Sequence, residues 1–422
     1  MSKSGYIFYF DESFHTRVIT NKSIKADNYY NSYTSIGMGI KKSLKNKGLR
    51  KLRLLEKKYK KLYSVEELKS EVVSRKKYIN GLASFSKIDL EFYYDFFELL
   101  YTNEFIYYIS SCDKVEYLLL QCDYKKSYYM NKFAMIYTLV KAINTYKPQK
   151  VMNDIFSKSQ DLLCDLKKFF REQIKTNGNL KLKEKENIAF SQVLLFLDSI
   201  KTTYIKYDFK YHFTYYGLKN LLDELNSNLK ETKVIIDEEG RGKILQNAKE
   251  IGFKNSIQLN SKKCIGIRSA DILCGFISRF MQGIYISTYN NPKEKYDKKH
   301  YIPVEWFKIN EKQFKLYKMV AKYLKKYSEI YYCSYISLYS DLFIETIGII
   351  YYFDEFKTFK DYLSIELNDH YEKCNTIIVA RLMEHLNQVE KMYCFWEKMV
   401  KQQEKNLYNY IKGRWVNILS NK

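Results

Sequence analysis

Two short apolar runs, each as long as a β-strand and each ending in acidic residues, constrain the fold of this chain most strongly. Tyr6–Phe10 stops at Asp11 and Glu12, and Lys233–Ile236 stops at Asp237 and Glu238. Short, apolar runs of this kind are typical of buried strands in a sheet. A third run, Tyr33–Ile40, follows a polar stretch suited to a turn, so we expect it to pair with the first as a hairpin.

The segments between these runs have the spacing of helices. Helical patterns cover residues 41–61, 90–101 and 212–229, and a further strand is expected over 104–111. The polar segment 255–263 leads into an apolar helix that Ser269 is expected to cap, which would place Asp271 in its first turn. Strands alternating with helices predict an α/β fold with a mixed sheet flanked by helices.

The length of 422 residues suggests more than one domain. The charged, helical stretch 148–210 is interpreted as an insertion that splits a core formed by residues 1–147 and 211–289. A turn-rich, charged segment follows residue 289 and marks the best candidate boundary. Residues 290–422 are therefore expected to form a mostly helical C-terminal domain.

Charge and location are informative in a limited way. The 71 Lys and Arg residues against 48 Asp and Glu residues give a net charge of +23, which favours nucleic acid as a partner. The abundance of Lys, Asn, Tyr and Ile is also what an AT-rich genome produces, so charge alone proves little. The chain shows no run long and apolar enough for a membrane span, no cleavable leader and no paired cysteine motif, and we expect a cytoplasmic protein with reduced, buried thiols.

Three separated acids share one pattern. Asp11 and Asp237 close strands, and Asp271 opens a helix, so all three can converge at one end of a sheet. Clustered carboxylates repel one another unless a cation lies between them, and Mg²⁺ or Mn²⁺ prefers such oxygen ligands. Taken singly, each acid can also simply end a strand or favour a helix N-terminus. Together, in a basic protein, they predict phosphodiester hydrolysis at a two-metal site.

The order of these elements resembles an RNase H-like fold, and more closely a bacterial family of uncharacterised domains within that superfamily. The resemblance covers about residues 6–283 without the insertion. It departs from the family at Phe14, where a small residue is usual, and at Arg268-Ser269, where a Gln is usual. The motifs that carry it are Tyr9-Phe-Asp-Glu-Ser13, Glu67-Leu-Lys69, Asp113-Lys114, Val234-Ile-Ile-Asp237 and Ser269-Ala-Asp-Ile-Leu-Cys-Gly275.

The resemblance implies a metal-dependent nuclease with Asp11, Asp237 and Asp271 as metal ligands. Glu67 would be a fourth catalytic residue. Glu12 and Glu238 would orient these ligands without binding the metal themselves. Arg241, Lys243 and Arg268 are candidates for contacts to the phosphates of RNA or DNA.

A second hypothesis remains open beside the nuclease. In it the chain is a non-catalytic module that binds nucleic acid or protein, and the acid cluster has only a structural role. A helical domain added to a nuclease-like core is also typical of phage-defence and mobile-element proteins, by analogy alone. The choice between RNA and DNA and the oligomeric state stay undetermined by these patterns.

Overall fold

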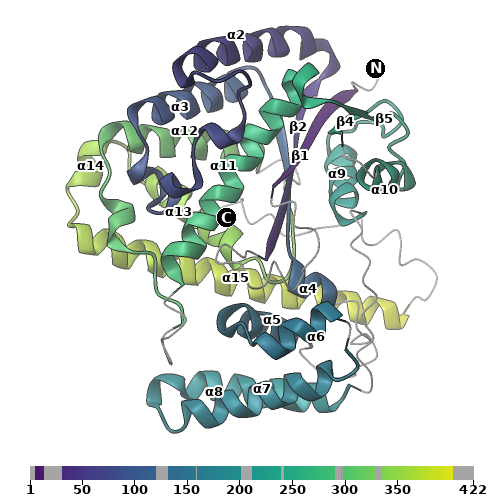
Figure 1. The fold of residues 1–422 in the computed structure, drawn as a ribbon, viewed down its shortest axis with the longest axis vertical. Coiled ribbons are helices and arrows are strands. Elements are labelled where there is room, and N and C mark those ends of the chain that lie inside the picture. Colours follow the sequence, from purple (N-terminus) through teal and green to yellow (C-terminus); the bar gives the residue numbers. More distant parts are fainter. Residues whose placement is uncertain are drawn as a thin grey trace.

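A computed structural model describes residues 5–13, 31–119, 132–157, 159–200, 212–238, 242–289, 296, 298–328 and 334–402 of the chain (Figure 1). It is a mixed α/β structure with one sheet among many helices. The strands are β1 (Tyr6–Ser13), β2 (Ser32–Lys41), β3 (Ile106–Asp113), β4 (Lys233–Asp237), β5 (Ser256–Leu259) and β6 (Ser334–Ile336). The helices are α2 (Lys45–Tyr63), α3 (Lys87–Thr102), α4 (Lys114–Leu119), α5 (Lys132–Tyr146), α6 (Gln149–Ser157), α7 (Leu162–Asn177), α8 (Glu184–Asp198), α9 (His212–Glu224), α10 (Lys243–Ile251), α11 (Ile265–Thr288), α12 (Glu311–Ser328), α13 (Asp341–Asp354), α14 (Phe359–Leu363) and α15 (Leu367–Gln402).

The six strands form one sheet in the order β5-β4-β1-β2-β3-β6. β2 is antiparallel to both of its neighbours, and the pairs β1–β4, β4–β5 and β3–β6 are parallel. The expected hairpin is confirmed, since Tyr6 of β1 lies opposite Lys41 and Ser13 lies opposite Thr34. Asp11 and Asp237 therefore end neighbouring parallel strands at the same edge of the sheet.

Glycines in β2 make room for the aromatic rings of β1. A Cβ added at Gly37 would lie 2.7 Å from the ring of Phe10, and one added at Gly39 would lie 2.5 Å from the ring of Phe8. Real Cβ atoms do not approach so closely, so the large aromatic side chains of β1 fit only beside glycine. The register of the hairpin and the packing of the sheet face thus depend on the same residues.

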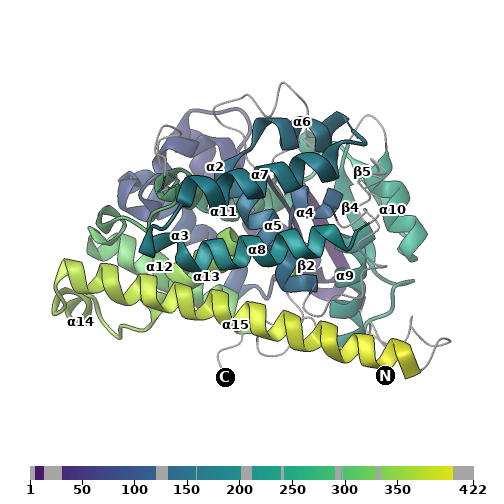
Figure 2. The same cartoon turned by 90° about the horizontal axis from the view of Figure 1, so that it is seen from below.

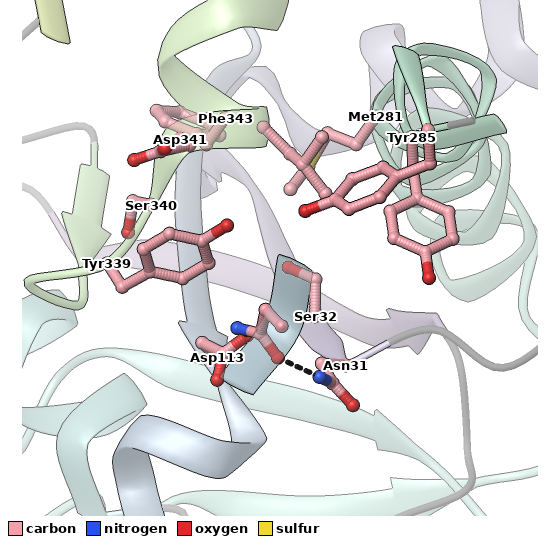
Figure 3. A pocket seen from close by; sticks show the side chains of 12 residues that line it. Asn31, Ser32, Asp113, Met281, Tyr285, Tyr339, Ser340, Asp341 and Phe343 are labelled. Carbon is pink, nitrogen blue, oxygen red and sulfur yellow. Dashed lines mark hydrogen bonds between the residues drawn. The ribbon is translucent and has the colours of Figure 1, made fainter. Parts of the chain in front are cut away.

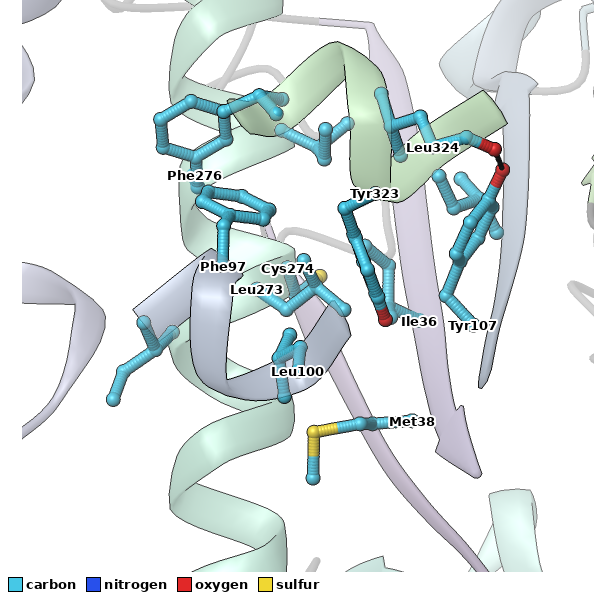
Figure 4. Close-up of a cluster of buried hydrophobic side chains, with 14 of the residues drawn as sticks. Ile36, Met38, Phe97, Leu100, Tyr107, Leu273, Cys274, Phe276, Tyr323 and Leu324 are labelled. Carbon is cyan, nitrogen blue, oxygen red and sulfur yellow. Dashed lines mark hydrogen bonds between the residues drawn. The ribbon is translucent and has the colours of Figure 1, made fainter. Parts of the chain in front are cut away.

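Helix α11 packs against the sheet and carries the central part of the core. In Figure 4 its Phe276 contacts Phe97 of α3, with ring centroids 4.9 Å apart, and Tyr323 of α12 lies beside the same ring of Phe97 at 5.7 Å. Ile36 and Met38 of β2 lie in this cluster as well, both fully buried. The sheet, α11 and the layer formed by α3 and α12 therefore share one continuous core.

Three details of the sequence interpretation are corrected. Helix α11 begins at Ile265, four residues before the expected cap, and the Ser269 hydroxyl donates to the Ile265 carbonyl inside the helix at 2.9 Å. Asp271 consequently lies in the second turn. Strands β5 and β6 fall in segments that were expected to be polar or helical, and each is recognisable only through its pairing with a longer neighbour.

The described C-terminal helices share the hydrophobic core of the sheet. Residues between Ile302 and Ile378, including the fully buried Trp306, belong to the same hydrophobic core as the sheet. The helices α4 through α8 form a second hydrophobic core, which also includes Leu338 and Tyr339. The insertion thus has its own core, which starts at Val115 rather than at residue 148, and the expected boundary at residue 289 separates no cores. Figure 2 shows α7 and α8 lying together, with α15 running along the lower edge of that view.

Two expectations about the environment are tested directly. Among the described helices, none is both long and apolar enough to cross a membrane. Cys112, Cys274 and Cys374 are buried free thiols and Cys264 is half-buried, but Cys164 is exposed, so the expectation that all the cysteines are buried is wrong.

Candidate acid cluster

Asp11 lies at the carboxyl end of β1 and is the centre of the acid cluster. Burial, followed by repulsion from Asp271, holds the pKa of its carboxyl well above the usual range, and Asp237 and Glu12 add further repulsion. One hydrogen bond opposes this effect, from the Glu12 backbone N–H to Asp11 Oδ1 at 2.8 Å. The fold therefore brings the three predicted aspartates into one electrostatically coupled group.

Asp271 projects from α11 toward the segment that follows α2. Its Oδ2 accepts a hydrogen bond from the Ser70 backbone N–H at 2.7 Å, and its Oδ1 accepts one from the Ser70 hydroxyl at 2.8 Å. Arg279, two turns further along α11, donates to Ser70 Oγ at 3.1 Å and to the Val73 carbonyl at 3.0 Å. These four bonds fix the segment around Ser70 against α11.

The fit at this point is tight. A Cβ added at Gly275 would lie 2.1 Å from Cβ of Ser70 and 2.5 Å from its hydroxyl oxygen. Only glycine at position 275 lets the backbone of the Ser70 segment approach close enough to bond both oxygens of Asp271. Ser70 and Arg279 are neighbours of the candidate site that the sequence interpretation missed, because nothing local in the sequence links position 70 to position 271.

Asp237 closes β4 and turns the chain. Its Oδ1 accepts hydrogen bonds from the backbone N–H groups of Glu238, at 2.9 Å, and Ser261, at 3.0 Å. Glu238 itself is exposed and accepts from the side chain of Asn260 at 3.1 Å. Asp237 thus has the turn-forming role of an ordinary strand end and also contributes to the negative potential at Asp11.

Glu12 and Glu67 have different environments. Glu12 is buried and accepts a hydrogen bond from the Tyr33 hydroxyl at 2.6 Å. Glu67 lies three residues before Ser70 with Oε2 at 3.6 Å from Lys69 Nζ, while its Oε1 is buried and accepts no hydrogen bond from the described residues. A buried carboxylate oxygen without a donor is unfavourable, and a bound cation would satisfy it.

The carboxylate oxygens are ligands that suit a hard cation, but the distances between them are too long for one ion to bind them all. Carboxylate oxygens, mutual repulsion at Asp11 and the orphaned oxygen of Glu67 are what Mg²⁺ or Mn²⁺ would relieve. Within the described ranges, however, no three His, Cys, Asp or Glu side chains lie close enough together to hold one ion. The acids form an electrostatic cluster rather than a preformed metal cage.

The three basic residues predicted to contact phosphate have different environments. Lys243 is exposed at the start of α10, and Arg241 lies outside the described residues. Arg268 is buried, and its guanidinium donates to both carboxylate oxygens of Glu56, at 2.6 and 2.8 Å. It also donates to two backbone carbonyls before α11. These bonds speak against the expected phosphate contact, because Arg268 ties α2 to α11 instead.

A second polar site lies further along the same edge of the sheet. Asp113 pairs with Ser32 and Asp11 with Ile36, four residues apart on β2, or roughly 13 Å. Figure 3 shows Asp113 beside Asn31 and Ser32 at a cavity of about 30 Å³, which holds only a few water molecules. Asp113 therefore lies apart from Asp11, although Lys114 is close enough to Glu12 to be attracted by it.

Burial dominates the titration of this second site. It raises the pKa of Asp113 to about 7, although hydrogen bonds from the Glu116 N–H and from Asn144 oppose the shift. It also lowers the pKa of Lys114 to about 8, against the attraction of Cys112, Asp113 and Glu12.

Comparison of the chain with family models, curated proteins and solved structures found no match.

Proposed function

We propose that the chain is a metal-dependent nuclease on an RNase H-like core, acting on RNA or DNA in the cytoplasm. The observation that carries the proposal is the position of Asp11, on the first strand of the sheet, in electrostatic contact with Asp237 of the neighbouring parallel strand and Asp271 of α11. The order of these elements is the one expected for such a core: an acid-bearing first strand, a hairpin, a later strand ending in an acid, and a helix carrying the last one.

Asp11, Asp237 and Asp271 would hold Mg²⁺ or Mn²⁺ only if the ion drew their carboxylates closer together than they lie in this structure, and Glu67 is the further catalytic candidate. A bound divalent ion supplies Lewis-acid stabilisation of the departing oxygen and lowers the pKa of a water molecule. The protein's own part is to orient the carboxylates, and two sets of contacts do so. Ser70 orients Asp271 through both carboxylate oxygens, and the Glu12 N–H orients Asp11.

The test is incubation of the full chain with labelled RNA, single-stranded DNA and duplex DNA in Mg²⁺ or Mn²⁺. We expect cleavage by the wild type and a loss of at least about 100-fold in Asp11→Asn and in Asp271→Asn. Glu172→Gln removes an exposed carboxylate of α7 and is the matched control, which should cleave normally. The proposal is wrong if the wild type is inactive on every substrate, or if activity survives in the double variant Asp11→Asn/Asp271→Asn.

A non-catalytic binding module is the second candidate, and one observation favours it. Both oxygens of Asp271 are already engaged by Ser70, as in a purely structural carboxylate. This alternative predicts binding of nucleic acid that weakens with salt but is indifferent to EDTA and to the two Asn substitutions. A divalent-ion requirement for binding would contradict it.

A further inference from the structure

A basic hollow lies on the outer side of the layer formed by α3 and α12. It has a volume of about 620 Å³. The inner side of the same layer packs against α11, the helix that carries Asp271, through Phe97, and Tyr323 of α12 packs on Phe97 in turn (Figure 4). The hollow is therefore separate from the acid cluster. Its lining contains Tyr94, Tyr101, Asp354 and five lysines, Lys315, Lys318, Lys322, Lys325 and Lys326.

The lysines form a stripe along α12. Each lysine lies three or four residues from another of the five, which places them on one face, and residues 315 to 326 span roughly 16 Å at the rise of an α-helix. Two of them, Lys318 and Lys325, bind the carboxylate of Asp354 at 3.0 and 2.7 Å. Lys315 pairs with Glu311 at 2.7 Å. Five lysines against these two carboxylates leave the stripe with an excess of three positive charges.

The excess is concentrated at Tyr101. The ammonium groups of Lys322 and Lys326 each lie 4.5 Å from the centre of its ring, and Lys326 also donates to the Tyr101 carbonyl at 2.8 Å. No carboxylate of the described chain pairs with either lysine. Two like charges at one ring repel each other, and an anion bound to both would offset that repulsion. A phosphodiester group has the charge and size for that position.

Tyr94 adds the second element of a single-strand binding surface. It lies on α3, seven residues and thus two turns before Tyr101, and its half-buried side chain lines the same hollow. Proteins that bind single strands without sequence preference combine a cationic groove with aromatic side chains on which bases stack. We propose that the hollow defined above acts as such a groove and binds the backbone of a single-stranded nucleic acid, with phosphate at Lys322 and Lys326 and a base against Tyr94. The inference rests on the proposed function in one respect only, which is the choice of nucleic acid as the polyanion that binds.

The test measures binding without cleavage. A fluorescein-labelled 20-nucleotide single strand is titrated with the full chain in EDTA at 0.15 M salt. We expect Lys322→Ala/Lys326→Ala to bind about tenfold more weakly and to lower the slope of log affinity against log salt by about 1.4, which corresponds to two lost phosphate contacts. Lys168→Ala/Lys175→Ala, on the distant helix α7, is the control and should bind as the wild type does.

A second variant distinguishes the loss of positive charge from a defect in folding. Lys322→Arg/Lys326→Arg keeps both charges, so it should restore affinity to within about threefold. Unchanged affinity in the alanine variant, or equal weakening in the arginine variant, would overturn the proposal. So would poly-glutamate that competes as well as the oligonucleotide, since that result points to an acidic protein partner.

The groove and the nuclease can fail independently. Loss of cleavage in Asp11→Asn, together with oligonucleotide affinity that is indifferent to the lysine replacements, would remove the groove and keep the nuclease. Weakened binding in Lys322→Ala/Lys326→Ala, together with a wild type that cleaves nothing, would keep the groove and remove the nuclease.

Discussion

Replacing Gly275 by alanine should destabilise the protein even though alanine is the better helix former. In the interior of α11 the substitution alone would stabilise by about 1 kcal/mol. The added Cβ, however, would lie 2.1 Å from Cβ and 2.5 Å from Oγ of Ser70, which is anchored to Asp271 by two hydrogen bonds. Overpacking of this kind costs up to about 3 kcal/mol. We therefore expect a net loss of about 2 kcal/mol.

The sign should reverse when Ser70 is glycine. Without the Ser70 side chain, the nearest remaining atom of that contact is the Ser70 Cα at 3.6 Å, an ordinary van der Waals distance. In the Ser70→Gly background, Gly275→Ala should then stabilise by about 1 kcal/mol, which gives a coupling energy of about 3 kcal/mol between the two positions.

Urea unfolding of the four proteins in this cycle measures the coupling. Gly283→Ala is the control, because its added Cβ would lie 2.1 Å from the carbonyl oxygen of Tyr78, a backbone atom that Ser70→Gly leaves in place. If Gly275→Ala stabilised the wild type by about 1 kcal/mol, the Ser70 segment would not lie against α11, and the orientation of Asp271 described above would be refuted.

Three further predictions concern buried charges. Arg268→Ala should lower the free energy of unfolding by about 3 kcal/mol, because Glu56 is left partly buried and unpaired. The substitution should leave oligonucleotide affinity unchanged. Weaker oligonucleotide binding at unchanged stability would instead show that Arg268 contacts phosphate. Asp113 has its pKa raised to about 7, so its native form holds a proton that the unfolded chain releases above pH 4. The stability of the wild type relative to Asp113→Asn should fall by up to about 4 kcal/mol between pH 4 and pH 7, and a flat difference in melting experiments would contradict this. Mg²⁺ at ten times its dissociation constant should stabilise the wild type by about 1.4 kcal/mol and Asp11→Asn by much less, as measured by thermal unfolding.

The parts of the fold that the sequence predicts are those with strong local patterns. Tyr6–Phe10 and Tyr33–Ile40 are apolar over the whole length of a strand, and the polar stretch between them in the sequence predicts that they pair as a hairpin. Ser256–Leu259 has no such pattern, because a four-residue strand at the sheet edge is half exposed and depends on β4 for its hydrogen bonds. The same holds for the three residues of β6.

The candidate site shows the same division. The strand ends predict that Asp11 and Asp237 lie side by side, since parallel neighbours end at one edge. The role of Arg268 was not predictable, because its partner Glu56 is 212 positions away and only packing of α2 against α11 brings them together. The spacing between the carboxylates is likewise a property of tertiary structure, and no local pattern encodes it.

The pairing of β3 with β6 has a consequence for synthesis of the chain. Ser111 pairs with Ile336, so the partner of this strand emerges from the ribosome 225 residues later. At roughly 5 to 20 residues per second, the open edge of β3 waits about 11 to 45 seconds for its neighbour. An open strand edge is a site for pairing with other chains. The nascent protein therefore passes through a period in which aggregation competes with folding, and a chaperone that covers β3 during that time would raise the yield of native protein.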